Sequence, residues 1–271
     1  MTEALLREYR QADIPALTAL WHRVFGDPEA LISRFFQLLP EMGSGAVAEL
    51  DGQAVGAAYI VDGLALLRPG VAPMPLAYLY AVAVDERCRG LGLGQAVTKA
   101  AADLALARGD AFVCTLPADA GLYGFYEKLI GIRCALHREK KELISYPGPA
   151  VLPLSAEEYL RRREELLAGT CHLRLSPAAM AFEHANCGCY GGGLFAVGDG
   201  IAAAYLEDGC CVVKELLSPS NSDREALAAA IGAALQSQSV LLYSPAAEGS
   251  AYIAAPEGRL PTDCVWNLAF D

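Results

Sequence analysis

One stretch of the sequence decides the fold: Val82-Ala83-Val84-Asp85-Glu86-Arg87-Cys88-Arg89-Gly90-Leu91-Gly92-Leu93-Gly94-Gln95. Its first residues end an apolar and aromatic run, residues 77–84, which is typical of a central strand buried on both faces. The residues that follow, 94–108, predict a helix that ends before Gly109-Asp110. We therefore predict a strand, a glycine-rich turn and a helix in direct succession.

A glycine-rich turn that enters a helix is suited to bind an anion. The first N–H groups of a helix have no intrahelical partner, and the helix dipole is positive at that end. Gly90, Gly92 and Gly94 alternate through the turn and let the backbone approach a ligand closely. Arg89 adds a fixed positive charge whose fork of donors matches phosphate oxygens. A turn that only joins a strand to a helix would need a single glycine, so the three alternating glycines favour an anion-binding loop.

The sequence before this stretch predicts two helices and a hairpin. We expect a strand over residues 5–10, a helix over 14–25 capped by Asp13, and a second helix over 29–39 capped by Asp27-Pro28. Asp51-Gly52 between apolar runs is a hairpin signal, and a loop rich in proline and glycine is expected over 68–75. After the stretch we expect a strand over 111–116, a helix over 122–129 and a strand over 131–137.

The second half of the chain repeats this order of elements. Pro147-Gly148-Pro149 predicts a domain boundary, and Ser155 and Ser176 each begin a predicted helix. Further elements are expected over 194–197, 201–206, 210–217, 223–236, 240–243 and 265–270. The loop over 217–222 lacks glycine, so we predict an internal repeat whose second copy has lost its anion loop.

Composition narrows the classes of partner and compartment. The net charge of −11 over 271 residues argues against nucleic acid, and it fits either a cationic small substrate or a merely soluble surface. Nine cysteines without a C-x-x-C pair indicate a reduced compartment. The sequence has no signal-peptide pattern and no uninterrupted apolar run of about 18 residues, so we expect a cytoplasmic protein without a membrane span.

The decisive stretch resembles the central motif of the GCN5-related N-acetyltransferase (GNAT) superfamily. That motif, Q/R-x-x-G-x-G/A, is met by Arg89, Gly92 and Gly94. Residues 125–132 resemble the family's F-Y-E-K-L-G-F segment with one inserted residue. The resemblance covers roughly residues 5–140 and departs at Glu86, where proline is frequent in the family.

The resemblance implies an α/β fold with a mixed, mostly antiparallel central sheet flanked by helices. It implies a GNAT domain over 1–147 and a smaller, degenerate GNAT-like α/β domain over 148–271 that shapes the acceptor site. The implied reaction moves an acetyl group from acetyl-CoA to a primary amine of a small molecule. The implied cofactor-binding residues are Val82, Ala83, Val84, Arg89, Gly90, Leu91, Gly92, Leu93, Gly94 and Gln95.

The same resemblance makes Tyr126 the general acid for the leaving CoA thiolate, with Tyr123 as its rival. Arg87 is expected to contact the 3′-phosphate of CoA. The general base stays open between Glu49 and the terminal carboxylate of Asp271.

Several alternatives stay open at this point. The chain could bind CoA as a regulatory module without turnover. Dinucleotide binding is the rival nucleotide class, but Gln95 stands where G-x-G-x-x-G needs glycine. His184, Cys187 and Cys189 match no common zinc spacing, so no metal is expected. We expect Gly188 and the glycines over 191–193 to form a flexible loop bordering the substrate cleft. The oligomeric state stays open.

Overall fold

The computed structural model describes residues 4–219, 223–246, 250–255 and 264–265. The chain forms two compact units. The first comprises Met1–Leu66, Pro73–Cys134 and Tyr252–Leu260, and the second comprises Leu67–Ala72, Ala135–Ala251 and Pro261–Asp271. The chain thus passes into the second unit earlier than the boundary predicted near residue 147, and the functional division at that residue stays a prediction.

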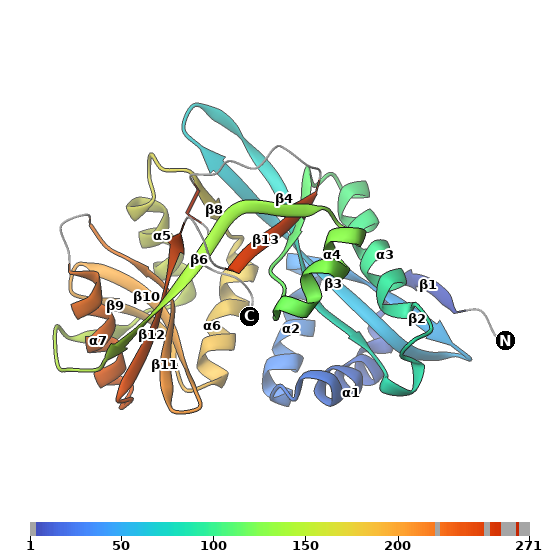
Figure 1. The fold of residues 1–271 in the computed structure, drawn as a ribbon, viewed down its shortest axis with the longest axis horizontal. Helices are drawn as coiled ribbons and strands as arrows, with labels where there is room; N and C mark the ends of the chain where they lie inside the picture. Colours follow the sequence, from blue (N-terminus) through green and yellow to red (C-terminus); the bar gives the residue numbers. More distant parts are fainter. Residues whose placement is uncertain (1–3, 220–222, 247–249, 256–263, 266–271) are drawn as a thin grey trace. The chain divides into compact units, whose positions relative to one another are not determined.

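The first unit carries helices against a sheet of order β1-β2-β3-β4-β5-β13 (Figure 1). Its strands are β1 (Leu5–Glu8), β2 (Gly43–Leu50), β3 (Gln53–Arg68), β4 (Val71–Val84), β5 (Phe112–Thr115) and β13 (Ser250–Ala255). Its helices are α1 (Ile14–Phe25), α2 (Glu29–Met42), α3 (Leu93–Ala107) and α4 (Tyr123–Leu129), with short 3-10 turns at Gln11–Asp13, Glu86–Cys88 and Ala120–Leu122. The β4–β5 pair is parallel, whereas β1–β2, β2–β3 and β13–β5 are antiparallel.

Of the turn and cap signals discussed for the first unit, the hairpin turn is confirmed and the two side-chain caps are not formed. The hairpin at Asp51-Gly52 is confirmed: both turn residues have positive φ, 50° and 77°, which a tight primed turn requires. The predicted side-chain caps at Asp13 and Asp27 are wrong. The carboxylate of Asp13 accepts from Arg7 and from the backbone N–H of Arg10, and that of Asp27 accepts from the indole of Trp21.

The loop predicted over residues 68–75 is also wrong. β3 runs to Arg68 and β4 begins at Val71, so that only a two-residue turn at Pro69-Gly70 separates them. Gly70 takes the positive φ of 74° that this turn needs. Pro75 is tolerated inside β4. Proline has no N–H to donate, but its carbonyl can still accept, and here it accepts the N–H of Ala111.

The aromatic residues of α1 and α2 form part of the core. Trp21, Phe35 and Phe36 are buried and pack their rings against Tyr59 of β3, with centroids 5.1–5.6 Å from that of Tyr59. Rings at these separations add to the stability that area burial gives. This cluster fixes the α1–α2 pair on the sheet.

The second unit repeats the element order of the first, as predicted. Its sheet has the order β6-β12-β11-β10-β9-β7. Its strands are β6 (Ile132–Ile144), β7 (Val151–Pro153), β8 (His172–Arg174), β9 (Gly193–Val197), β10 (Gly200–Glu207), β11 (Cys210–Leu217) and β12 (Ser239–Ala246), and its helices are α5 (Ala156–Leu166), α6 (Pro177–Cys189) and α7 (Arg224–Ala234). β11 pairs with β12 in parallel across α7, as β4 pairs with β5 across α3. The cap predicted at Ser155 and the helix start predicted at Ser176 are confirmed, and Ser176 also caps its helix.

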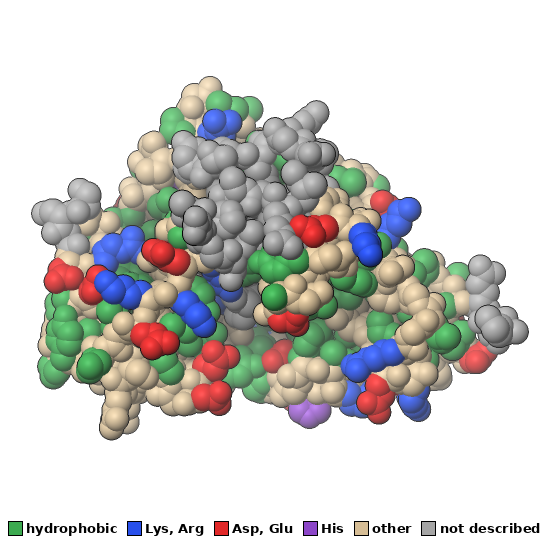
Figure 2. All heavy atoms as spheres, viewed as in Figure 1, with side chains coloured by type: hydrophobic (Ala, Val, Ile, Leu, Met, Phe, Trp, Pro, Cys, Tyr) green, Lys and Arg blue, Asp and Glu red, His purple; other side chains and the backbone are tan. Residues whose placement is uncertain are grey.

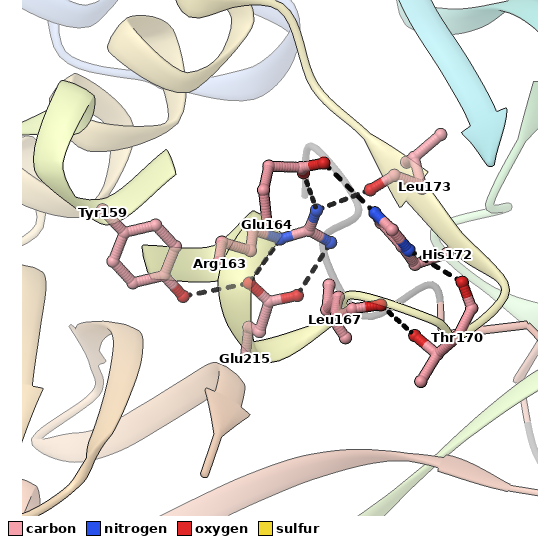
Figure 3. A network of polar contacts seen from close by, with 8 residues as sticks. All are labelled: Tyr159, Arg163, Glu164, Leu167, Thr170, His172, Leu173 and Glu215. Carbon is pink, nitrogen blue, oxygen red and sulfur yellow. Dashed lines mark hydrogen bonds and ion pairs between the residues drawn. The ribbon is translucent and has the colours of Figure 1, made fainter. Parts of the chain in front are cut away.

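A charged network lies buried in the second unit (Figure 3). Arg163 of α5 and Glu215 of β11 have side chains with no exposed surface, and the guanidinium Nε lies 2.9 Å from the carboxylate. The hydroxyl of Tyr159 donates to the same carboxylate at 3.0 Å, and Arg163 Nη1 donates to the carbonyl of Leu173. A second buried pair joins Lys214 to Glu183 at 2.8 Å. Buried charges need such partners because their desolvation is costly.

The glycines around residue 190 do not form the flexible loop predicted. Gly188 lies within α6 and Gly193 begins β9. A Cβ on Gly192 would lie 2.0 Å from the carbonyl oxygen of Ala204 and 2.5 Å from the Cα of Tyr205. The missing side chain at Gly192 therefore permits close backbone packing within the second unit.

Gly192→Ala should destabilise the protein, whereas Gly188→Ala should not. The new methyl at residue 192 meets backbone that cannot move aside, and overpacking of this kind costs about 1–3 kcal/mol. Nothing lies within 4 Å of a Cβ at Gly188, and alanine is favoured over glycine in a helix by about 0.5–1 kcal/mol. Urea unfolding of both variants measures the difference. Equal midpoints would contradict this account of the glycines.

Figure 2 shows acidic and basic side chains interspersed with hydrophobic ones on one face of the molecule. Among the described helices, none is both long and apolar enough to cross a membrane.

Candidate functional site

The site begins where β4 parts from β5. The two strands pair only at Leu76–Tyr78, although β4 continues to Val84. Ala81 has a φ of 48°, a left-handed conformation that is unusual for a residue other than glycine. On the opposite edge of β4, the chain remains hydrogen-bonded to β3. The N–H of Asp85, just after β4, donates to the carbonyl of Val55 at 2.8 Å. In the described pairing, no β5 residue faces Val82, Ala83 or Val84, so their backbone edge is open.

The glycine-rich loop presents a row of backbone N–H groups that donate to no described backbone carbonyl. Gly90 and Gly92 have φ values of 81° and 76°, and nothing lies within 4 Å of a Cβ built on either. Within the part of the chain that the structure describes, the N–H groups of Gly90, Leu91 and Gly92 donate to no backbone carbonyl. α3 begins at Leu93, so the N–H groups of its first turn have no intrahelical acceptor.

The third glycine of the loop lies against β4 and α4, where there is also room for an alanine. A Cβ on Gly94 would lie 3.6 Å from Val84 and 3.9 Å from the ring of Phe125, which is ordinary van der Waals contact. Val84 and Phe125 both pack on the core that holds Leu93 and Tyr126. Figure 1 shows α3 and α4 as neighbours in the first unit. The loop is thus a fixed cradle between β4 and α4, open on the side of Gly90 and Gly92.

Arginine side chains flank this cradle. Arg89 is exposed at its start. Arg87 was expected to contact the 3′-phosphate of CoA. In the structure it donates to the Asp85 carboxylate through Nε and Nη2, each at 2.9 Å, while 80% of its side chain stays exposed. Asp85 also accepts from Arg23 of α1 at 3.1 Å. The bonds from Arg87 hold the pKa of the Asp85 carboxyl well below its usual value. Sequence reasoning missed both Arg23 and Asp85.

Tyr126 lies in α4 and is 9% exposed. Burial, with a smaller contribution from the charge of Asp119, raises the pKa of its phenol to about 12. A phenol with this pKa is protonated at neutral pH, as a proton donor must be, but it yields its proton less readily than a free phenol. Tyr123, the rival from sequence, is half-buried on the edge of the same core.

Of the two carboxylates considered as the general base, the structure describes only Glu49. Glu49 accepts from Arg7 at 2.7 and 2.9 Å, and Arg7 also binds Asp13. This carboxylate therefore links β1, β2 and the start of α1, and its ion pair with Arg7 argues against Glu49 as the base. Asp271 lies outside the described residues.

Among the described residues, no group of three or more histidine, cysteine, aspartate or glutamate side chains is placed to hold a metal ion. Cys187 instead donates to Glu183 inside the second unit, and burial raises the pKa of its thiol well above the usual value. His172 contacts Glu164 and the carbonyl of Thr170 (Figure 3).

Comparison with known proteins gives a family match and a fold match. Residues 5–132 match the model of the acetyltransferase (GNAT) family. A search of curated proteins found no match.

Solved structures resemble the chain over most of its length. A GCN5-related N-acetyltransferase from Kribbella flavida has a TM-score of 0.64 at 17% identity, with 93% of this chain and 71% of that chain covered. A probable N-acyltransferase from Enterococcus faecalis has a TM-score of 0.68 at 14% identity, with 93% and 72% covered. Eis1 from Mycobacterium abscessus has a TM-score of 0.63 at 16% identity, with 93% and 73% covered. At these identities the likeness shows a shared fold, and it confirms the predicted fold class. Residues 5–132, just under half of the chain, thus match an acetyltransferase (GNAT) family domain.

Proposed function

We propose that this protein transfers an acetyl group from acetyl-CoA to the primary amine of a small cationic acceptor. The observation that carries the proposal is the loop over residues 89–95. Its unpaired N–H groups, its open glycine faces and the exposed Arg89 suit the diphosphate of CoA. The match of residues 5–132 to the acetyltransferase (GNAT) family model supports acyl transfer as the reaction class.

In the proposal, the pantetheine arm of CoA binds along the edge of β4 that is not paired with β5. The pantetheine arm of CoA carries amide groups that can pair with a strand, and the backbone of Val82, Ala83 and Val84 is free to bind them. An N–H group at this edge would also stabilise negative charge on the thioester oxygen as the amine attacks. These backbone roles need no particular side chain, which fits the apolar sequence of β4.

The chemistry requires two proton movements. The amine nitrogen attacks the thioester carbon, the carbon–sulfur bond breaks, and CoA leaves as a thiolate. In the proposal, the Tyr126 hydroxyl gives its proton to that thiolate, while the proton of the amine passes to a base that is still to be identified. The raised pKa of Tyr126 keeps its hydroxyl protonated at neutral pH, as a donor to the thiolate must be.

Gly92→Asp should weaken acetyl-CoA binding by about tenfold to 100-fold. Aspartate tolerates the left-handed backbone better than most residues, so the variant should fold. Its carboxylate would occupy the space above residue 92 and repel the diphosphate. Gly52→Asp is the matched control, because Gly52 has a φ of 77° and equally open surroundings in the β2–β3 turn. Isothermal titration measures both, and equal affinities would refute the role of the loop.

Release of free thiol separates an enzyme from a CoA-binding regulatory module. Acetyl-CoA is mixed with the protein and a panel of polyamines, aminoglycosides and amino acids. Thiol release together with an acetylated amine supports the proposal. Tight CoA binding without product from any amine would support the regulatory module instead.

Two further expectations accompany the proposal. The cysteine side chains that the structure describes are all free thiols, which supports a reducing, cytoplasmic setting. The part that residues 148–271 play in shaping the acceptor site stays a prediction, as does a homo-oligomeric state.

A further inference from the structure

The two strands that open the candidate site part before β5 has ended. β4 and β5 pair at Leu76–Tyr78 and Phe112–Cys114, whereas β5 continues to Thr115. The end of β5 is not frayed, because its other edge is still paired with β13 at Thr115. The separation of β5 from β4 therefore has a cause other than the end of the strand.

Two side-chain hydrogen bonds join the strands at the point where they separate. The hydroxyl of Thr115 donates to the carbonyl of Leu79 at 3.1 Å. The N–H of Leu116 donates to the hydroxyl oxygen of Tyr78, also at 3.1 Å. In a continued ladder, the backbone groups of the two strands would bond to one another at these positions. Tyr78 and Thr115 are only 3% and 4% exposed, so their hydroxyl groups give buried backbone groups partners while a side chain spans the gap.

The backbone of β4 is strained just beyond these bonds. Ala81 has a φ of 48°, a left-handed conformation that a residue with a Cβ keeps only where its surroundings hold it. The bond to the carbonyl of Leu79 fixes the chain before Ala81, and the bond from Asp85 N–H to the Val55 carbonyl fixes it afterwards. The direction of Val82–Val84 is thereby set from both ends.

We propose that Tyr78 and Thr115 are positioning residues for acyl transfer, whose hydroxyl groups hold β5 away from β4 and keep the backbone edge at Val82–Val84 open for the thioester. The role needs no contact between these side chains and the substrate. The inference rests on the proposed function, since it takes that edge as the place where the pantetheine arm binds. Loss of either hydroxyl would leave a buried backbone group without its partner and favour a shift of β5 toward β4.

The test compares acetyl-CoA with adenosine 3′-phosphate 5′-diphosphate, which keeps the diphosphate of CoA but lacks the pantetheine arm. Isothermal titration of the full chain should show that Thr115→Val and Tyr78→Phe each weaken acetyl-CoA binding by about tenfold. The nucleotide, whose diphosphate contacts the loop over residues 89–95 in the proposal, should keep its affinity in both variants. The kcat with an amine from the panel should fall together with the affinity for acetyl-CoA. Thr115→Ser, which keeps the hydroxyl, should restore both.

Thr98→Val is the matched control for the loss of a buried hydroxyl. Thr98 is buried in α3 of the same unit, and its hydroxyl has no hydrogen-bond partner among the described residues. The same chemical change therefore breaks no bond there, and it should leave the affinities for both ligands unchanged.

The outcomes separate this inference from the proposed function. Equal losses of affinity for both ligands would mean a general structural effect and would overturn the inference, as would unchanged acetyl-CoA binding and kcat. A Thr115→Ser variant as defective as Thr115→Val would also overturn it. In these cases acetyl-CoA binding by the unchanged protein leaves the proposed function standing. Tyr78→Phe and Thr115→Val remove different bonds, so either variant decides the matter if the other does not fold. If the unchanged protein binds neither ligand, the proposed function fails and this inference fails with it.

Discussion

Glu215→Ala should destabilise the protein by about 3–5 kcal/mol. The substitution leaves the Arg163 guanidinium buried without its carboxylate, and removing one partner of a buried pair typically costs this much. The hydroxyl of Tyr159 would lose its acceptor at the same time. Urea unfolding followed by circular dichroism measures the loss.

Two comparisons make this prediction specific. Glu165→Ala removes an exposed partner of Arg161 on the same helix, α5, and should leave the unfolding midpoint nearly unchanged. The triple variant Tyr159→Phe, Arg163→Met and Glu215→Leu replaces the whole network by apolar groups and should recover most of the stability. A triple variant that is less stable than Glu215→Ala would show that the network contributes more than mutual neutralisation.

Tyr126→Phe should lower kcat by about 100-fold or more, with little change in the KM for acetyl-CoA. General acid catalysis typically contributes a factor of about 10²–10⁴, and phenylalanine removes only the hydroxyl from a side chain that is 9% exposed. The proposed diphosphate contacts lie on residues 89–95 and are untouched. Steady-state kinetics at saturating acetyl-CoA, with an amine identified from the panel, measures the effect.

Tyr123→Phe is the matched control for this loss. Tyr123 belongs to the same helix and packs at the edge of the same core, so its substitution should have a similar effect on packing but leave kcat nearly unchanged. If Tyr126→Phe keeps the original kcat, or if Tyr123→Phe shows the larger loss, the general acid is not Tyr126.

Signals that act within a few residues were readable from the sequence. The tight turn at Asp51-Gly52 and the helix caps at Ser155 and Ser176 depend on their own backbone or on an N–H three residues away. The strand–loop–helix unit around Gly92 was readable for the same reason, because its glycines set the local backbone. The order of such elements predicted the repeat, whereas the fold class was implied by the resemblance to the GNAT superfamily.

Side-chain pairing between distant elements was not readable. Glu49 stayed a candidate base in the sequence because its partner Arg7 lies 42 positions away on a neighbouring strand. The link between Arg23 and Asp85 and the link between Arg163 and Glu215 likewise join separate helices and strands. Composition misled at residues 68–75, where proline indicated a loop but occupies strand positions that need only a carbonyl.

Hydrogen exchange at the loop amides tests the central claim most directly. The N–H groups of residues 90–95 should exchange fast in the free protein where they have no acceptor, and saturating acetyl-CoA should slow them at least tenfold. The N–H groups at Gly52 and Gly70, which lie in other turns, should exchange at the same rate with and without acetyl-CoA. Binding of acetyl-CoA without protection at residues 90–95 would contradict the claim that this loop holds the diphosphate.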